Sequence, residues 1–384
     1  MPAPLPRRHF LQTALATTAA ACLPGPSRAA ASDRFSFVLL GDLHFDKLEH
    51  HDLAWIEKHK GGDLGQIRNY SKLTVEIMPQ LFGTLRDVIV EAQRTPGHEI
   101  DFVLQVGDLV EGLCGTEELA ARQNREAVDF VAAAGLDVPF VFTKGNHDVT
   151  GDGAPAAFDQ VLLPFQKQQA AKFTSTIERA GANYAFTHGG AEFFFFDAYV
   201  PDSLDWLEAA LAKRSAKQAF VVIHPPVVPY GARATWHLYA SPKDAARRAK
   251  LLTLLGQQHA FVLGGHIHRF NSLARLTENQ GRFAQLAVSS VINKATPAAK
   301  DELLGVAEYT GDQIRVEPRF SPETEPQRRA VYDAERPFVP EFEYADLPGY
   351  AVVTVDGGSV VARIYAGTSR QLWRTVDLAA VLHA

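Results

Sequence analysis

Cysteine is almost absent from this sequence, which has only Cys22 and Cys114 among its 384 residues. Cys22 lies in an N-terminal segment that we expect to be removed, so the remaining chain cannot form an internal disulfide bond. Three alanines precede Cys22, and the leucine expected three residues before a lipidated cysteine is missing, which favours an unlipidated chain over an anchored one. Cys114 is expected to be a small buried apolar residue.

Long apolar runs and an excess of positive charge are also missing. No run reaches the roughly 18 apolar residues that cross a membrane, so we expect no membrane span. Lysine and arginine number 38 against 44 acidic residues, a net charge of −6, which becomes 35 − 44 = −9 without the three arginines of residues 1–31. Since duplex nucleic acid normally requires a basic face, we expect a small substrate instead. The oligomeric state cannot be predicted from these features.

Residues 1–31 have the pattern of an export signal. Arg7 and Arg8 precede an apolar stretch, residues 11–23, and three alanines, residues 29–31, provide a cleavage site. The paired arginines resemble a twin-arginine signal, which exports folded proteins, and this predicts a periplasmic or secreted protein. The alternative is a general secretory signal with a chance arginine pair.

Five apolar runs each end at residues with metal-binding side chains. Short β-rich runs of this kind predict buried strands, and open α/β sheets gather their active sites at the carboxyl ends of strands. We therefore expect one site formed by all five strand ends. The runs, with the polar residues that follow them, are 35–40 (Asp42, His44), 102–106 (Asp108), 138–142 (Asn146, His147, Asp148), 219–223 (His224) and 261–263 (His266, His268).

The side chains in this set predict a two-metal centre. Residues i and i+2 of an extended segment point the same way, so Asp42 with His44, and His266 with His268, can face one cavity as pairs. Carboxylate, amide and imidazole ligands without thiolate suit Mn, Fe, Zn, Co or Ni. The seven ligand candidates, which exclude His147 and Asp148, are too many for one four-coordinate zinc. A glycine directly precedes four of them, where the backbone must turn sharply and approach the ions.

These motifs resemble those of the calcineurin-like metallophosphoesterase family, which read D-x-H, G-D, G-N-H-D, H and G-H-x-H. The likeness covers roughly residues 35–365. It implies an α/β (α+β) fold of four layers, in which a central β-sandwich of two mixed sheets is flanked by helices. In this chain the motifs are Asp42-Leu43-His44, Gly107-Asp108, Gly145-Asn146-His147-Asp148, His224 and Gly265-His266-Ile267-His268.

The resemblance also implies a role for each side chain. Asp108 bridges the two ions, and His147 faces the leaving group as an acid or a hydrogen-bond donor. Asp148 is expected to set the tautomer of His147. The implied reaction is attack on phosphorus by a hydroxide that both ions share. The implied ligands are Asp42, His44 and His268 for the first ion, and Asn146, His224 and His266 for the second.

Hydrolysis of a small phosphate mono- or diester is the expected function. The alternatives are a nucleotidase or nucleotide phosphodiesterase, although the chain has no room for a large base-binding domain, and a metal-binding protein of the same fold that has lost turnover. A purple acid phosphatase would have a tyrosine three residues after Asp108, where this chain has Glu111.

The rest of the chain is expected to form a single domain, residues 32–384. Helical spacing predicts crossover helices over 73–92, 117–133, 202–212 and 245–255. Loops over 46–71 and 225–239 leave ligand-bearing strands, so Arg68, Asn69 and His237 are candidates for substrate contact, the alternative being solvated side chains. Residues 307–345 are interpreted as an extended surface wrap, and 349–366 as a hairpin.

Overall fold

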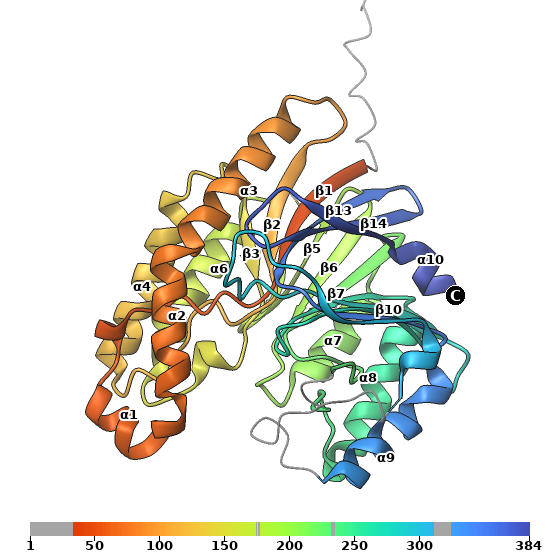
Figure 1. Ribbon diagram of the computed structural model, residues 1–384. Coiled ribbons are helices and arrows are strands. Elements are labelled where there is room, and N and C mark those ends of the chain that lie inside the picture. The colour runs from red at the N-terminus through yellow and green to blue at the C-terminus, as the bar shows by residue number, and fades with distance from the viewer. Residues whose placement is uncertain (1–33, 174, 176, 232–234, 311–323) are drawn as a thin grey trace, which may run out of the picture. The chain divides into compact units, whose positions relative to one another are not determined.

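Two mixed β-sheets form the centre of the computed structural model, which describes residues 34–173, 175, 177–231, 235–310 and 324–384 (Figure 1). The first sheet has the strand order β15-β14-β13-β1-β2-β3, and the second has the order β11-β12-β9-β10-β8-β7-β6-β5-β4. Each sheet combines parallel pairs, such as β1 with β2 and β6 with β7, with antiparallel ones, such as β1 with β13 and β9 with β12. The predicted pair of mixed sheets is confirmed.

The strands begin and end close to the apolar runs of the sequence. Those of the first sheet are β1 (Arg34–Leu40), β2 (Ile100–Gln105), β3 (Phe140–Phe142), β13 (Gly349–Asp356), β14 (Ser359–Ala366) and β15 (Leu372–Asp377). Those of the second are β4 (Glu178–Ala180), β5 (Asn183–His188), β6 (Ala191–Phe196), β7 (Gln218–Ile223), β8 (Phe261–Gly264), β9 (Phe270–Leu276), β10 (Arg282–Ala287), β11 (Lys300–Leu304) and β12 (Glu341–Asp346).

Aromatic rings fill the space between the two sheets. Phe37 of β1 stacks on Phe102 of β2 with centroids 5.0 Å apart, and Phe193 of β6 stacks on Phe220 of β7 at 4.7 Å. Phe37 meets Phe193 edge-on at 5.6 Å, which joins the two sheets. Because the outer faces are also covered, the central strands are buried on both sides and are continuously apolar instead of alternating.

Helices cover the outer face of each sheet (Figure 1). Apolar side chains of α3 and α4 pack on the first sheet, and those of α7 and α8 pack on the second. The predicted crossover helices are present, with α4 at the predicted bounds. The helices are α1 (Leu53–Lys60), α2 (Leu64–Glu76), α3 (Met78–Gln93), α4 (Glu117–Ala133), α5 (Ala154–Ala157), α6 (Leu163–Ala170), α7 (Ser203–Ala212), α8 (Ala245–Gln257), α9 (Glu325–Glu335) and α10 (Leu378–His383).

Two segments that were expected to be irregular contain regular structure. Residues 46–71, interpreted as a loop, contain α1 and most of α2. In α1 the side chain of Asp52 caps the helix by accepting a hydrogen bond from the Trp55 amide. Within residues 307–345, interpreted as an extended wrap, the structure places α9 and β12, so that interpretation is wrong for most of the described part of the segment. Helices α1 and α9 are short and have few apolar residues, so the sequence gives little sign of either.

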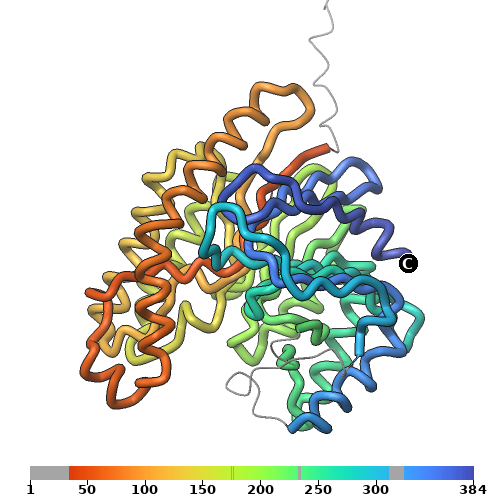
Figure 2. Tube along the Cα trace, viewed as in Figure 1, coloured from red at the N-terminus to blue at the C-terminus, as the bar shows by residue number. Residues whose placement is uncertain are grey.

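The C-terminal strands lie beside the N-terminal one. Residues 349–366 form an antiparallel hairpin of β13 and β14, and β13 also pairs with β1 over residues 34–39 (Figure 2). Residues Asp33–Ala384 form one compact unit. The predicted export signal, including Cys22, lies outside the described residues. Within the part of the chain that is described, no helix has the length and apolar character needed to cross a membrane.

Candidate metal centre

All seven predicted ligand side chains follow strands whose carboxyl ends meet at one edge of the two sheets. Those following β1, β2 and β3 come from the first sheet, and those following β7 and β8 come from the second. Their ligand atoms converge on two groups. The first sheet provides Asp42, His44, Asp108 and Asn146, and the second provides His224, His266 and His268.

The first group joins Asp42, His44, Asp108 and His268, whose ligand atoms all lie within 4.8 Å of one another. The Nε2 atoms of His44 and His268 are 3.0 Å apart. Asp42 Oδ1 lies 3.5 Å from His268 Nε2, and Asp108 Oδ2 lies 3.8 Å from His44 Nε2. Two carboxylates and two imidazoles therefore place their ligand atoms around one position that a metal ion could occupy.

The second group joins Asp108 with His224 and His266, and the side-chain oxygen of Asn146 completes it. Asp108 Oδ2 is 3.1 Å from His224 Nε2. Asn146 Oδ1 is 2.9 Å from His266 Nδ1, which in turn is 3.3 Å from His224 Nε2. Asp108 belongs to both groups, which is the arrangement that a carboxylate bridging two ions requires.

The distances within both groups fit atoms that share a cation. Metal–ligand bonds of about 2.1 Å place neighbouring ligand atoms about 3.0 to 3.4 Å apart. The hydrogen bonds of His224 support the same conclusion. Its Nδ1 donates to the carbonyl oxygen of Val106 at 2.8 Å, so Nδ1 carries the proton of a neutral ring. Its Nε2 then faces two acceptors, the oxygens of Asp108 and Asn146 at 3.1 and 3.2 Å. A lone pair facing two oxygens needs a proton or a cation between them.

The pKa shifts indicate which ligand side chains carry a proton when no cation is bound. Burial lowers the pKa of His224, but the carboxylates of Asp108 and Asp42 outweigh burial and raise it to about 9. Burial raises the pKa of Asp42, yet the neighbouring histidines, His268 foremost, lower it to about 2. Burial and His224 lower the pKa of His266 to about 3. Ionised carboxylates and a neutral imidazole are therefore available as ligands at neutral pH.

The backbone at this site tolerates little change. A Cβ on Gly145 would overlap the Asp108 carboxylate, and one on Gly265 would lie 2.6 Å from Asp42 Oδ2, so the predicted close approach at these glycines is present. Four ligand residues themselves adopt positive φ: 50° at His44, 56° at Asp108, 70° at His266 and 57° at His268. Left-handed backbone at residues with a side chain is strained, and such strain clusters at functional sites.

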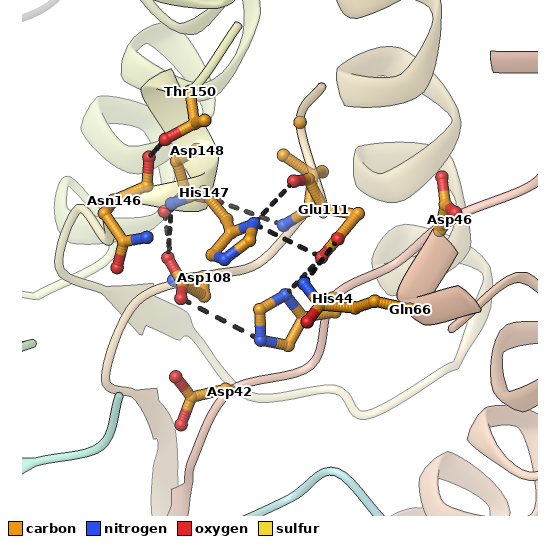
Figure 3. Close-up of polar contacts among 12 residues, drawn as sticks. Asp42, His44, Asp46, Gln66, Asp108, Glu111, Asn146, His147, Asp148 and Thr150 are labelled. Carbon is orange, nitrogen blue, oxygen red and sulfur yellow. Dashed lines mark hydrogen bonds and ion pairs between the residues drawn. The ribbon is translucent and has the colours of Figure 1, made fainter. Parts of the chain in front are cut away.

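Glu111 holds His147 in place, and Asp148 does not. His147 Nδ1 donates to the carbonyl oxygen of Glu111 at 2.8 Å and lies 3.3 Å from the Glu111 carboxylate (Figure 3). Burial lowers the pKa of His147, but Glu111 and Asp108 raise it to about 9. The Asp148 carboxylate accepts instead from the backbone amides of Gly145, Asp108 and Val110 at 2.8, 3.1 and 3.1 Å. The prediction that Asp148 orients His147 is wrong, since Asp148 braces the loops that present the ligands.

Glu111 also contacts a ligand, and sequence reasoning missed this. Its Oε2 lies 2.8 Å from His44 Nδ1, while Oε1 accepts from the side chain of Gln66 at 2.9 Å (Figure 3). The proton on His44 is thereby placed on Nδ1, which leaves Nε2 to face the first group. The only available signal was the position of Glu111 three residues after Asp108.

The three predicted substrate contacts are not joined to the site. Arg68 and Asn69 are exposed on α2, and no hydrogen bond or ion pair links either to a described ligand residue. His237 is buried with Nδ1 2.9 Å from the carbonyl oxygen of Thr235, and burial lowers its pKa to about 4. Their contact with substrate stays a prediction.

The neighbours of these residues lie at the site instead. Tyr70, next to Asn69, is buried and stacks on His44 with ring centroids 4.3 Å apart and planes 8° apart. Trp236, next to His237, lies 4.6 Å from the ring of His266. Both predicted segments therefore reach the site, and which residue of a helix or loop faces inward depends on tertiary packing.

The comparisons with known proteins agree with this geometry. The family model described as calcineurin-like phosphoesterase matches residues 35–270. Among curated proteins, none matches this sequence.

Solved structures resemble this chain at low sequence identity. A purple acid phosphatase from seeds of yellow lupin (Lupinus luteus) has a TM-score of 0.50 and 13% identity, covering 90% of this chain and 53% of its own. The structure of PhoD gives 0.49 and 14%, covering 91% and 69%. A dimetal phosphatase from Danio rerio gives 0.48 and 14%, covering 90% and 99%. The chain thus spans about half the length of the lupin enzyme.

Proposed function

Because the chain belongs to the calcineurin-like phosphoesterase family, we propose that it hydrolyses a small phosphate ester, a mono- or diester, at a centre of two metal ions. The observation that carries this proposal is the place of Asp108 in both groups of ligand atoms. The first ion would be held by Asp42, His44 and His268, and the second by Asn146, His224 and His266. The donor set suits Mn, Fe, Zn, Co or Ni.

When bound, the two ions supply Lewis acidity to the phosphoryl oxygens and make water acidic enough to provide a nucleophile near neutral pH. Asp108, which belongs to both groups of ligand atoms, would hold the two ions side by side. The burial of Asp42 and His224 excludes water from the ligand set and strengthens the attraction between its carboxylates and the cations that they would hold.

His147 provides the proton for the leaving oxygen. Its Nδ1 is occupied by the carbonyl oxygen of Glu111, so Nε2 is the nitrogen that meets the substrate. The raised pKa of about 9 keeps the ring protonated at neutral pH before the ions bind. A protonated imidazole both stabilises charge on the departing oxygen and neutralises it by proton transfer.

The N-terminal segment also suggests where in the cell the protein acts. Residues 1–31 direct the protein out of the cytoplasm, by the twin-arginine route if both Arg7 and Arg8 are needed. Replacing both arginines with lysine should keep the protein in the cytoplasm, which cell fractionation measures. Export at the normal level would show that a general secretory signal is present instead.

The test of the proposed function uses metal-stripped protein reloaded with each of the five metals. We expect hydrolysis of an aryl phosphate mono- or diester with at least one metal. Asp108→Ala should lose both ions, because it removes the shared ligand. His147→Ala should keep both ions and lower kcat by about 10² to 10⁴, the usual contribution of a positioned acid. Elemental analysis and steady-state rates measure these results.

Two outcomes would count against the proposal. Full occupancy of both ions in Asp108→Ala would refute the bridging role. Bound ions without turnover of any ester would indicate a protein that keeps the centre for binding and no longer for catalysis.

A further inference from the structure

Trp236 is an exposed aromatic side chain beside the candidate metal centre. Its ring centroid lies 4.6 Å from that of His266, with the planes 43° apart, and 41% of its surface is exposed. Its neighbours Thr235 and His237 are buried, and so are the residues from Ile223 to Gly231. Among the exposed large apolar side chains of the described residues, Trp236 is the only aromatic one, and it lies beside a candidate ligand.

The segment that carries Trp236 is held on both sides of residues 232–234. Before them, Tyr309 donates to the carbonyl oxygen of Pro229 at 2.6 Å, and Tyr332 donates to that of Gly231 at 3.2 Å. After them, the amide of Leu238 donates to the carbonyl oxygen of Pro226 at 2.8 Å. The position of the ring beside His266 is therefore built into the fold.

Arg248 adds a further connection across this segment. One of its nitrogens donates to the carbonyl oxygens of Val227 and Leu238, at 2.9 and 3.2 Å. The same guanidinium pairs with Glu335 of α9. Through Arg248, helix α9 thus stabilises the segment that contains Trp236.

Trp236 and His147 lie by different ions of the proposed centre. His147 meets the ring of His44 edge-on at 4.7 Å, on the side of the first ion, whereas Trp236 contacts His266, a ligand of the second. A phosphoryl group held by both ions would have His147 at one end and Trp236 at the other. The aromatic residue on the side of the first ion, Tyr70, is buried against His44 and has only 5% of its surface exposed.

We propose that Trp236 binds the ester substituent that stays on phosphorus, and that the natural substrate is a phosphodiester whose retained group is planar and apolar. This inference rests on the proposed function. A planar group that stacks on the exposed indole removes apolar surface of both from water and gains the attraction between aromatic rings. A phosphomonoester has no organic group at this position and would leave Trp236 exposed.

Three substrates with one leaving group test the proposal. Bis(p-nitrophenyl) phosphate retains an aryl group, ethyl p-nitrophenyl phosphate retains an alkyl group, and p-nitrophenyl phosphate retains neither. Trp236→Ala should lower kcat/KM about 10-fold for the first, the discrimination expected from one stacked apolar group. It should change the values for the other two little. Trp236→Phe should restore most of the loss, because it retains an aromatic face.

The controls separate stacking from structural damage. Trp206→Ala removes a tryptophan that packs on the covered face of the second sheet and should leave all three rates unchanged. An equal fall with all three substrates in Trp236→Ala would overturn the proposal and reduce Trp236 to a support for His266. Because the three substrates share one leaving group, a ring placed at the leaving group would also give this equal fall.

A binding measurement distinguishes failure of this inference from failure of the proposed function. Diphenyl phosphate should quench the fluorescence of zinc-loaded protein more than diethyl phosphate does, and Trp236→Phe should abolish the difference. If no ester is hydrolysed but this difference is present, the proposed function fails and the aromatic subsite remains. Equal quenching by both diesters would refute the subsite, whatever the rates.

Discussion

At the scale of single residues, the sequence indicates the candidate ligands but not the contacts that support them. Each ligand directly follows an apolar strand run, which is a local signal, and the paired motifs fix the spacing. Glu111, in contrast, acts through His44 and His147, which lie far from it in the sequence and reach it only through tertiary structure. Because Glu111 lies outside the five motifs, its sequence neighbours do not indicate these contacts.

Glu111→Gln should weaken metal binding without removing a ligand. The carboxylate beside His44 Nδ1 raises the basicity of the ring, and a neutral amide does this poorly. We expect affinity for the first ion to fall by about 10- to 100-fold, the usual effect of losing such a partner. Titration of metal-free protein, followed by calorimetry, measures the change. Unchanged affinity would show that Glu111 serves His147 alone.

His51 forms a buried ion pair with Asp46 behind the site. Its Nε2 lies 2.7 Å from Asp46 Oδ1, and its Nδ1 lies 3.0 Å from the carbonyl oxygen of Leu113. Two acceptors require both nitrogens to carry protons, so the ring is a cation. Burial opposes this charge, but Asp46 and the Leu113 carbonyl outweigh it and raise the pKa of His51. The pKa of Asp46 is lowered, since burial is outweighed by His50 and His51.

The pair should therefore stabilise the protein in a limited pH range. The pKa of folded His51 is raised, so its contribution is complete below the unfolded value of about 6.5 and disappears as pH rises through the folded value. His51→Ala should lower the free energy of unfolding by about 3 kcal/mol at pH 6, and by less at pH 10. Urea denaturation at both pH values measures this, and His59→Ala on exposed α1 is the control. An equal loss at both pH values would contradict the charged pair.

At the scale of elements, the sequence predicts helices where apolar residues face a sheet, and fails where helices pack by polar contacts. The four helices with clear periodicity cover sheets, and α4 was predicted at its observed bounds. Helix α9 has few apolar residues, its buried residues are Tyr332 and Glu335, and it is attached by hydrogen bonds and ion pairs that a search for apolar runs does not detect. Helix α1 is also poor in apolar residues, and its Trp55 and Ile56 pack in a small separate cluster with Leu64 and Ile67 of α2.

Glu335 is the residue through which α9 is attached. It pairs with Arg248 of α8 and, at 2.9 Å, with Arg275 of β9. Glu335→Gln should lower the free energy of unfolding by about 3 to 5 kcal/mol, because two largely buried guanidinium groups lose their shared counter-charge. Glu325→Gln, which removes an exposed pair with Arg329 on the same helix, should cost about 1 kcal/mol or less. Urea denaturation measures both, and equal losses would contradict this account.

At the scale of the whole molecule, the proposed ions connect the two sheets. The first ion would join Asp42 and His44 of the first sheet to His268 of the second, and the second ion would join Asn146 to His224 and His266. The sequence predicts this set of ligands, but which sheet supplies each one follows only from the order of the strands. The centre is thus part of the interface between the sheets.

Removing the ions should consequently lower the melting temperature. A ligand present at about 100 times its Kd stabilises the folded state by about 2.7 kcal/mol, and two ions add such contributions. We expect a chelator to lower Tm by several degrees, which differential scanning calorimetry measures. Asp108→Ala is the control and should melt at a temperature that the chelator no longer changes. An unaltered Tm in the chelated wild-type protein would show that the sheets do not depend on the centre.

Strand β1 has a neighbour from each end of the sequence, since it lies between β2 and β13. Residues 34–39 pair with residues 351–356, more than 300 positions later. A fragment that stops at residue 270, where the family match ends, would leave the fully buried backbone edge of β1 open to another chain, which is a route to aggregation. Contacts of such separation also slow folding. During folding, β1 therefore gains its second neighbour only when β13, near the C-terminus, pairs with it.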